Sequence, residues 1–376
     1  MFKLALQNPN FIVMKMMKKS PGYFVLFYIF LLMISCTKDH LNFGEDSSTS
    51  NILTEEISSQ NKNAKTNGFK DCNINALAYM EGDISCTSTS FENVLFGYFD
   101  QILNEPFFDF TVFNYYLKLN RDYVTHYRGP NYFGKNGEYT KLVEKRSREL
   151  SKFWDLNKEV VINAQHSNFL DDREILTDMI ESFDRTVRNR DEAYAKADLL
   201  LEMNRKSPNF PENPIFALET FTKSNGLIVL GDGLIQVLTE AGIEESIAIS
   251  AVLAHEWWHQ LQFENSDVWK EIKNINSVAE RSRFLELEAD FAAAYFLAHK
   301  RGATYNWKRI EEFFSLSFNV GDCGIEDAMH HGTPNQRLQA SRQGYEVAQS
   351  ARKKGFILTP DQVHQVFVEN LEVILN

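Results

Sequence analysis

The sequence is poor in cysteine and in positive charge, and it has no internal repeat. Four cysteines occur among 376 residues, and no two of them have the C-x-x-C spacing of a cysteine zinc site. The formal net charge is -12, which would repel a polyanion at long range. These absences argue against cysteine-bound zinc and against a nucleic-acid partner.

A continuous apolar run lies near the N-terminus, at Tyr23–Ser35, and it is too short to span a bilayer comfortably. Lys15, Lys18 and Lys19 come shortly before it. The letters M-I-S-C that end at Cys36 resemble a bacterial lipobox, so residues 1–35 are expected to be a lipoprotein signal peptide. The resemblance implies cleavage before Cys36 and lipidation of its sulfur, which attaches the protein to a membrane. An uncleaved membrane anchor is the alternative.

The residues after Cys36 bear on the final location. Thr37 stands where the enteric lipoprotein pattern has Asp for inner-membrane retention. We therefore expect a lipid-anchored protein of the bacterial cell envelope, sorted to the outer membrane, with the periplasmic or external side left open. Residues 36–68 are polar and nearly free of aromatics, so they cannot bury enough apolar surface to offset chain entropy. We expect them to form a flexible tether.

Three cysteines remain once Cys36 carries lipid: Cys72, Cys86 and Cys323. They allow one disulfide in three ways and leave one thiol over. Cys72 with Cys86 is the local choice.

The most informative motif is His255-Glu-Trp-Trp-His259, an instance of H-E-x-x-H. Helical periodicity is expected from Glu244 to Asn265, and positions four apart on a helix share a face, so both imidazoles can reach one ion. Glu256 is offset by roughly 100° and can reach a water on that ion. The motif predicts zinc-assisted hydrolysis with Glu256 as the general base. The two tryptophans at the x positions are expected to be core or groove-wall packing.

A third protein ligand is needed, because catalytic zinc takes three protein groups and leaves one position for water. Glu286 and Asp290 are four apart in a second helical pattern that runs to Gly302. We expect Glu286 to be the ligand and Asp290 to orient a ligating imidazole. An ordinary charged helix face is the alternative for this pair.

A third cluster precedes another helix. Thr333, Pro334 and Gln336 form a capping-box signal, which places His331 in the loop before the helix and Arg337 inside it. A loop histidine is usually solvated. Next to a zinc centre, however, His331 and Arg337 become candidates for stabilising the tetrahedral oxyanion.

The order of these three clusters resembles the gluzincin metallopeptidases, in particular the CAAX prenyl endopeptidase and HtpX family and the bacterial neutral zinc metallopeptidases. The resemblance spans about Asn213 to Arg337 and implies one zinc ion per chain on His255, His259 and Glu286. It also implies Glu256 as general base and acid, Asp290 behind a ligand, and active-site roles for His331 and Arg337.

The resemblance implies an α+β fold class that is predominantly helical, with a zincin-like core and a small sheet before the active-site helix. A strand over Asn213–Phe221 would be followed by a turn, a second strand and a helix within Asn225–Ile235. Residues 213–376 are then the zinc metallopeptidase core with C-terminal helices. Residues 69–212 are rich in aromatics and show helical periodicity, for example over Asp172–Asn204, and are expected to cover that core.

The expected function is that of a membrane-tethered zinc metalloendopeptidase acting on protein or peptide substrates. The strand near Phe216–Phe221 would hold an extended substrate by strand addition. The alternative is a catalytically silent zinc-binding lipoprotein that acts as a binding or chaperone-like module. Hydrolysis of non-peptide amides or esters, exopeptidase activity, the substrate and the oligomeric state are left open by the sequence.

Overall fold

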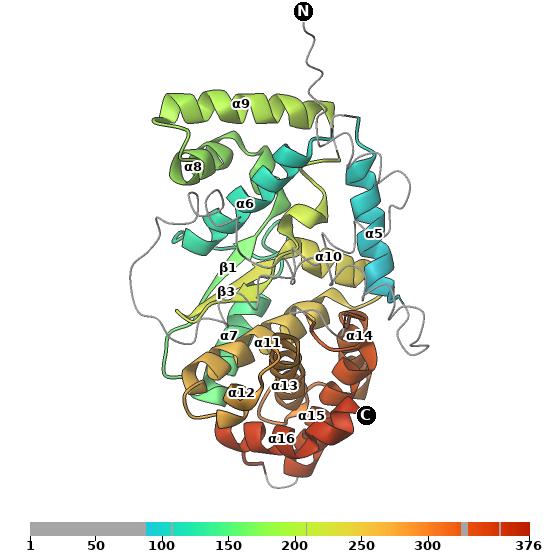
Figure 1. Ribbon diagram of the computed structural model, residues 1–376. Coiled ribbons are helices and arrows are strands. Elements are labelled where there is room, and N and C mark those ends of the chain that lie inside the picture. The colour runs from blue at the N-terminus through green and yellow to red at the C-terminus, as the bar shows by residue number, and fades with distance from the viewer. Residues whose placement is uncertain (1–87, 107, 208, 325–329, 353–354) are drawn as a thin grey trace, which may run out of the picture.

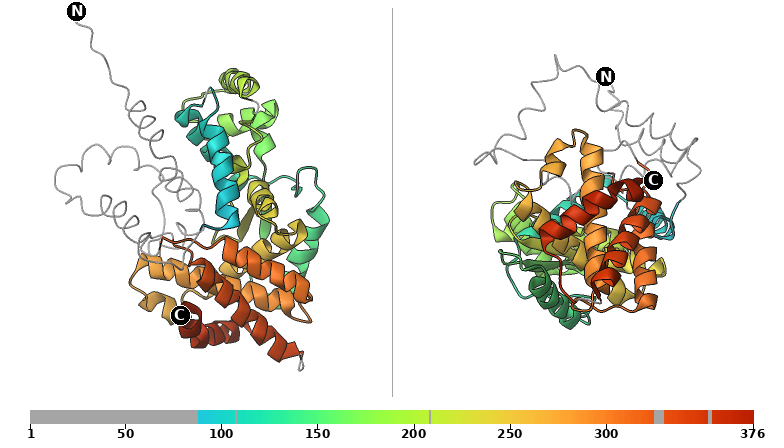
Figure 2. Two further views of the ribbon diagram at one scale, coloured as in Figure 1. Left: turned by 90° about the vertical axis from the view of Figure 1, so that its right-hand side faces the viewer. Right: turned by 90° about the horizontal axis from the view of Figure 1, so that it is seen from below.

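The computed structural model describes residues 88–106, 108–207, 209–324, 330–352 and 355–376. Within them the chain is predominantly helical and contains one three-stranded sheet, which confirms the expected fold class at that level (Figure 1). The sheet lies in the middle of the molecule. Helices α6, α8 and α9 lie at one end and the C-terminal helices at the other, as the further views in Figure 2 also show.

The first described half of the chain is mainly helical, as its periodicity predicted. Its helices are α5 (Ser90–Leu103), α6 (Phe110–His126), α7 (Thr140–Trp154), α8 (Arg173–Phe183) and α9 (Arg190–Lys206). The expected helical stretch over Asp172–Asn204 is divided in two. Helix α8 ends at Phe183, and α9 starts afresh after Asn189, whose side chain accepts a hydrogen bond from the Glu192 amide.

The sheet joins the N-terminal and C-terminal parts of the chain. Strand β1 (Val161–Gln165) pairs in parallel with β3 (Leu227–Gly231), and β2 (Phe221–Thr222) pairs antiparallel with the other edge of β3. All three strands precede the H-E-x-x-H helix in the chain. Residues 69–212 and 213–376 therefore share one sheet.

The prediction of a strand over Asn213–Phe221 is mostly wrong. Pro214–Ala217 forms a 3-10 helix, η2, because the Asn213 side chain accepts a hydrogen bond from the Ile215 amide and Pro214 favours a first helical turn. Only Phe221 and Thr222 are extended in the sheet. Phe216 is buried in η2, so it is not an edge-strand residue that a substrate can pair with.

Two glycines let η2 pack closely on the following elements. A Cβ on Gly231 would lie 2.3 Å from the Ala217 carbonyl oxygen, and one on Gly233 would lie 1.9 Å from that of Pro214. Any other residue would force η2 away from β3 and from α10 (Asp232–Glu240). This close approach fixes the segment after η2, which reaches the candidate site described below.

The C-terminal part is a set of packed helices: α11 (Glu245–Asn265), α12 (Lys270–Asn274), α13 (Val278–Ala298), α14 (Trp307–Asn319), α15 (Pro334–Arg352) and α16 (Pro360–Leu375). Helix α13 packs against both α11 and α15. Nearly every residue of α13 from Phe284 onward is buried, which is the pattern of a helix enclosed on all sides.

The capping box expected at Thr333 is present, and a second one lies at the start of the last helix. Thr333 and Gln336 exchange backbone-to-side-chain hydrogen bonds of 3.1 and 3.3 Å at the start of α15. Thr359 and Gln362 form the same motif at the start of α16, with hydrogen bonds of 2.9 and 3.3 Å. Each box satisfies amide groups that a helix start leaves without a partner.

The two tryptophans of the H-E-x-x-H segment are core residues. Trp257 is 2% exposed and Trp258 is fully buried. The Trp258 ring contacts Trp154 and Trp269, with ring centroids 4.9 and 5.8 Å away. Neither tryptophan lines the cavity at the candidate site, so neither shapes it directly.

Some sequence expectations concern residues that the structure does not describe. Cys36, the signal segment 1–35 and the tether 36–68 lie outside the described residues. In the part that is described, no helix combines the length and the apolar character that a bilayer crossing requires. Cys323 is disulfide-bonded, whereas Cys72 and Cys86, for which the sequence favoured a local pairing, lie outside the described residues.

Candidate metal centre

Helix α11 brings the H-E-x-x-H residues together. His255 and His259 are one turn apart on the same face, and their Nε2 atoms lie 3.1 Å from each other. Potential ligand atoms of His255, Glu256 and His259 all lie within 4.8 Å of one another. These three residues lie close enough to hold a metal ion.

Helix α13 places Glu286 against the two imidazoles. Its Oε2 lies 3.2 Å from His255 Nε2, and its Oε1 lies 3.4 Å from His259 Nε2. Tetrahedral ligands at the bond lengths of zinc are about 3.3 to 3.5 Å apart. The spacing of these donor atoms therefore fits a tetrahedral metal ion.

Both Glu256 and Glu286 carry carboxylates near the imidazoles, but their surroundings differ. The Glu286 oxygens face one Nε2 each. The Glu256 carboxylate is instead engaged by Thr222, whose hydroxyl donates to Oε2 over 2.6 Å. On this geometry Glu286 is the better candidate for the third ligand. Glu256 is held at the edge of the site, where it can act on a bound water.

The Nδ1 atoms of both histidines face hydrogen-bond acceptors. His255 Nδ1 lies 3.0 Å from Asp290 Oδ1, and His259 Nδ1 lies 2.7 Å from Gln262 Oε1. Each Nδ1 therefore donates its proton, which directs the lone pair of each Nε2 toward the other and toward Glu286. Such a cluster of electron pairs is repulsive unless a cation lies among them, either a proton on His255 Nε2 or a metal ion.

The charges around His255 favour a cation at this point. Burial opposes protonation of His255, but Asp290 and Glu286 outweigh it and raise the pKa of the imidazole to about 10. Burial likewise works against the charge of Glu286, yet His255 and His259 hold the pKa of its carboxyl well below its ordinary value. A site that favours imidazolium this strongly also attracts a metal ion.

Arg337 is paired with Asp290. Its Nε donates to Asp290 Oδ2 over 2.7 Å, and its second terminal nitrogen donates to Oδ1 over 2.9 Å. Burial alone would raise the pKa of Asp290, but Arg337 and His255 lower it, so the carboxylate stays charged. The bidentate contact holds Asp290 in place behind His255 and occupies most of the guanidinium.

His331 lies in the loop before α15 and is oriented by Asp322. The Asp322 carboxylate accepts a hydrogen bond from the His331 amide over 2.8 Å, and its Oδ2 lies 3.6 Å from His331 Nδ1. Burial lowers the pKa of His331, but Asp322 and Glu286 outweigh it, so the pKa is raised. An imidazolium here would place positive charge beside the metal site.

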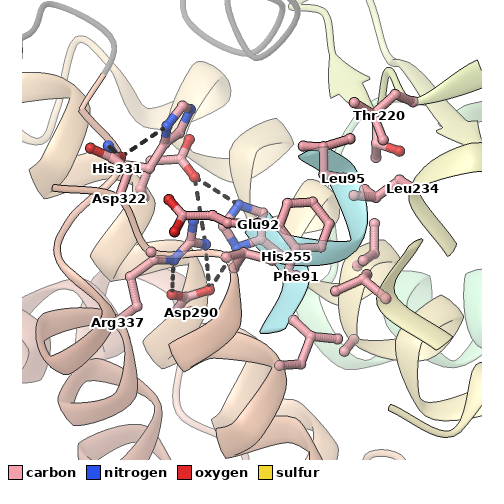
Figure 3. A pocket seen from close by; sticks show the side chains of 18 of the residues that line it. Phe91, Glu92, Leu95, Thr220, Leu234, His255, Asp290, Asp322, His331 and Arg337 are labelled. Carbon is pink, nitrogen blue, oxygen red and sulfur yellow. Dashed lines mark hydrogen bonds and ion pairs between the residues drawn. The ribbon is translucent and has the colours of Figure 1, made fainter. Parts of the chain in front are cut away.

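These groups share one cavity of about 170 Å³, shown in Figure 3. His331, Asp322, Arg337 and Asp290 lie along one side, and Leu95, Leu234 and Thr220 lie opposite. The apolar wall comes from α5, α10, α11 and α14 and includes Phe91, Leu95, Leu234, Leu238, Val252 and Phe313. The cavity thus joins the candidate metal centre to a mostly apolar chamber.

All residues predicted for the zinc site lie together at this place: His255, Glu256, His259, Glu286, Asp290, His331 and Arg337. Three further residues were not predicted from the sequence: Thr222, Gln262 and Asp322, which hold Glu256, His259 and His331. Gln262 had a signal, since it follows His259 by three positions on one helix face. Thr222 and Asp322 come from a short strand and a loop, and no local spacing indicates their partners.

No protein-family model, no curated protein and no solved structure matches this chain.

Proposed function

We propose that this protein is a zinc-dependent metallopeptidase, with His255, His259 and Glu286 as the zinc ligands. The observation that carries the proposal is the spacing of 3.1, 3.2 and 3.4 Å among their donor atoms. Imidazole nitrogens with a carboxylate form a ligand set typical of catalytic zinc, which keeps one position for water. When bound, zinc would lower the pKa of that water and polarise the scissile carbonyl.

Glu256 supplies the proton transfers in this proposal. Its carboxylate takes the proton of the attacking water and later delivers it to the leaving amine. The hydroxyl of Thr222 donates to its Oε2 and thereby orients the carboxylate. This arrangement supports a general base rather than a fourth ligand.

His331 is the group we assign to the oxyanion. Its raised pKa favours the charged form, and the ring lines the cavity together with His255 and Glu286. Arg337 is committed to Asp290 by two hydrogen bonds. We therefore assign Arg337 to holding Asp290 against the His255 imidazole, and His331 to stabilising developing negative charge.

The apolar chamber indicates the substrate. A peptide whose scissile bond lies at the metal centre would place a neighbouring side chain against Leu95, Leu234 and Val252. Burying an apolar side chain there is favourable, and burying a charged one is costly. We expect cleavage beside bulky apolar residues.

Glu256→Gln tests the reaction. The variant should retain one zinc per chain, measured by elemental analysis, and should lose about a hundredfold or more in the rate of cleaving a peptide library. Glu264→Gln is the matched control: Glu264 lies two turns further along α11 and bonds to Asn157 outside the cavity. It should cleave at the wild-type rate.

Full activity in Glu256→Gln would contradict the mechanism. A wild-type protein that binds zinc and cleaves no peptide would contradict the peptidase assignment and would favour the silent binding module. Cleavage abolished by a chelator and restored by zinc is the outcome expected of the wild type.

A further inference from the structure

An unbroken series of buried polar contacts leads from His259 away from the cavity. His259 Nδ1 lies 2.7 Å from Gln262 Oε1, and Gln262 Nε2 lies 2.7 Å from Glu288 Oε2. Glu288 Oε1 lies 2.6 Å from His364 Nδ1. The series therefore runs from α11 through α13 to α16. None of these three further residues belongs to the motifs from which the site was predicted.

Gln262 can take only one orientation in this environment. Its amide nitrogen donates one proton to the Leu285 carbonyl oxygen over 2.9 Å and the other to Glu288. Both of these partners are acceptors, so a flipped amide would set oxygen against oxygen. The amide oxygen must then face His259, and it accepts the Nδ1 proton.

Glu288 is held in turn by His364. Glu288 is fully buried, and its Oε1 accepts a hydrogen bond from His364 Nδ1. The two nitrogens of His364 face carboxylates, Nδ1 toward Glu288 and Nε2 toward Glu271 at 3.1 Å. Both nitrogens therefore donate. A buried carboxylate oxygen without a hydrogen-bond donor would be costly, so the N–H of His364 holds Glu288 in place.

The His364 ring is itself fixed by packing. It stacks on Trp269 with ring centroids 4.3 Å apart and planes inclined by 4°. Trp269 continues the stack onto Trp258, the second tryptophan of the H-E-x-x-H segment. His364 is thus connected to α11 in two ways, by hydrogen bonds through Glu288 and Gln262 and by ring stacking through Trp269.

We infer that Gln262, Glu288 and His364 are positioning residues that set the tautomer of His259 and thereby strengthen metal binding. The inference rests on the proposed function, since it concerns the same metal centre. Its new content is that helix α16, which carries no ligand, is part of the metal site. Groups that hold ligating histidines commonly contribute 10-fold to 100-fold to metal affinity.

The test measures zinc dissociation constants by competition with a chromogenic chelator. Gln262→Leu should weaken zinc binding by about 10-fold to 100-fold. Gln260→Leu is the matched control, because Gln260 is an equally buried glutamine of α11 whose amide donates to the Lys223 and Leu227 carbonyl oxygens. It loses the same kind of hydrogen bonds without touching His259, and it should bind zinc as the wild type does.

A pair of variants at position 364 tests the distant end of the series. His364→Phe keeps a ring to stack on Trp269 and removes both donors, so it should weaken zinc binding. His364→Asn places an amide N–H where Nδ1 was, so it can still donate to Glu288 and should restore affinity. Position 364 lies on α16, so these two variants still test the inference if Gln262→Leu does not fold.

The tautomer of His259 is read by nitrogen NMR of histidine-labelled, metal-free protein. The wild type and Gln260→Leu should show the proton on Nδ1, and Gln262→Leu should lose this preference. A merely structural role of Gln262 would leave the tautomer unchanged.

Wild-type affinity and an unchanged tautomer in Gln262→Leu, or equal affinities of the two variants at position 364, would overturn the inference alone. Failure of the proposed function looks different. It would appear as zinc binding that survives the removal of His255 or His259, whatever the residue at position 262.

Discussion

The two imidazoles of the candidate centre differ in what holds them. His255 is backed by a carboxylate that Arg337 fixes, and His259 by the neutral amide of Gln262. A charged acceptor makes its imidazole a stronger donor to a metal than a neutral one does. His255 is therefore expected to be the tighter of the two nitrogen ligands.

Thr222 offers a test at the scale of one hydroxyl group. Its Oγ1 donates to the Glu256 carboxylate, and Thr222→Val keeps the shape of the side chain while removing that hydrogen bond. Hydrogen bonds to charged groups contribute about 1.5 to 3 kcal/mol, so turnover should fall by roughly tenfold to a hundredfold if the orientation of Glu256 depends on it. The measurement is the turnover number beside the bound zinc.

Thr177→Val is the control for that variant. Thr177 is a buried threonine whose hydroxyl donates to a backbone carbonyl within α8, away from the cavity. It should lose some stability and no turnover. Unchanged turnover in Thr222→Val would show that Glu256 is oriented by other contacts.

Single residues were predicted best where their partner is local in sequence. His255 and His259 share a helix face by spacing alone, and Glu286 with Asp290 repeat that spacing on a second helix. That these two faces meet is a tertiary fact, which the order of the motifs suggested and periodicity could not show. Asp322 reaches His331 across a loop, and no propensity rule encodes such a contact.

At the scale of elements, helix ends were predictable and the short strands were not. The capping boxes at Thr333 and Thr359 mark the starts of α15 and α16, because side-chain capping is a local interaction. The extended stretch expected after Asn213 failed for the same local reason, since Asn213 caps a 3-10 turn. Strand β2 depends on pairing with β3, which is not local.

Helix α16 gives a pH-dependent prediction. Burial lowers the pKa of His364, but Glu288 and then Glu271 outweigh it, so the pKa is raised in the folded protein. A raised folded-state pKa contributes stability that is fully present below the unfolded value, near 6.5, and is lost as pH rises through the folded pKa. The stability difference between wild type and His364→Phe should therefore be larger at pH 6 than at pH 9.

Urea unfolding of metal-free protein at both pH values measures that difference. Hydrogen bonds to charged groups set its scale at about 1.5 to 3 kcal/mol at the lower pH. His299→Phe is the comparison, because burial lowers the pKa of His299 and its ring bonds to the Phe356 carbonyl oxygen instead of a carboxylate. A difference for His364→Phe that grows toward pH 9 would contradict the ion pair.

The whole molecule is built around two enclosed helices and a sheet that joins distant parts of the chain. Helices α11 and α13 are buried along most of their length, and the candidate metal ligands lie between them. The predominance of helix and the position of the sheet before α11 followed from the sequence. The pairing of β1 with β3 did not, because parallel strands require a crossover that no short pattern reveals.

Removal of the metal should therefore lower the free energy of unfolding of the whole molecule. Zinc that binds only the folded protein, at a free concentration a thousand times its dissociation constant, stabilises it by about 4 kcal/mol. A shift of this size lowers the unfolding temperature by about 10 °C for a protein of this class. Calorimetry with and without chelator measures the shift, and His259→Ala should show little of it. Equal unfolding temperatures in wild type would contradict metal binding between α11 and α13.

The place of His364 along the chain has a consequence for synthesis. A nascent polypeptide that has emerged as far as Arg337 already contains every residue of the three motifs, but it does not yet contain α16. Until that helix has been made and has docked, Glu288 lacks its hydrogen bond from His364. The contacts that fix the Nδ1 proton of His259 are then incomplete. Zinc binding at the proposed centre would thus stay about 10-fold to 100-fold weaker until α16 has docked.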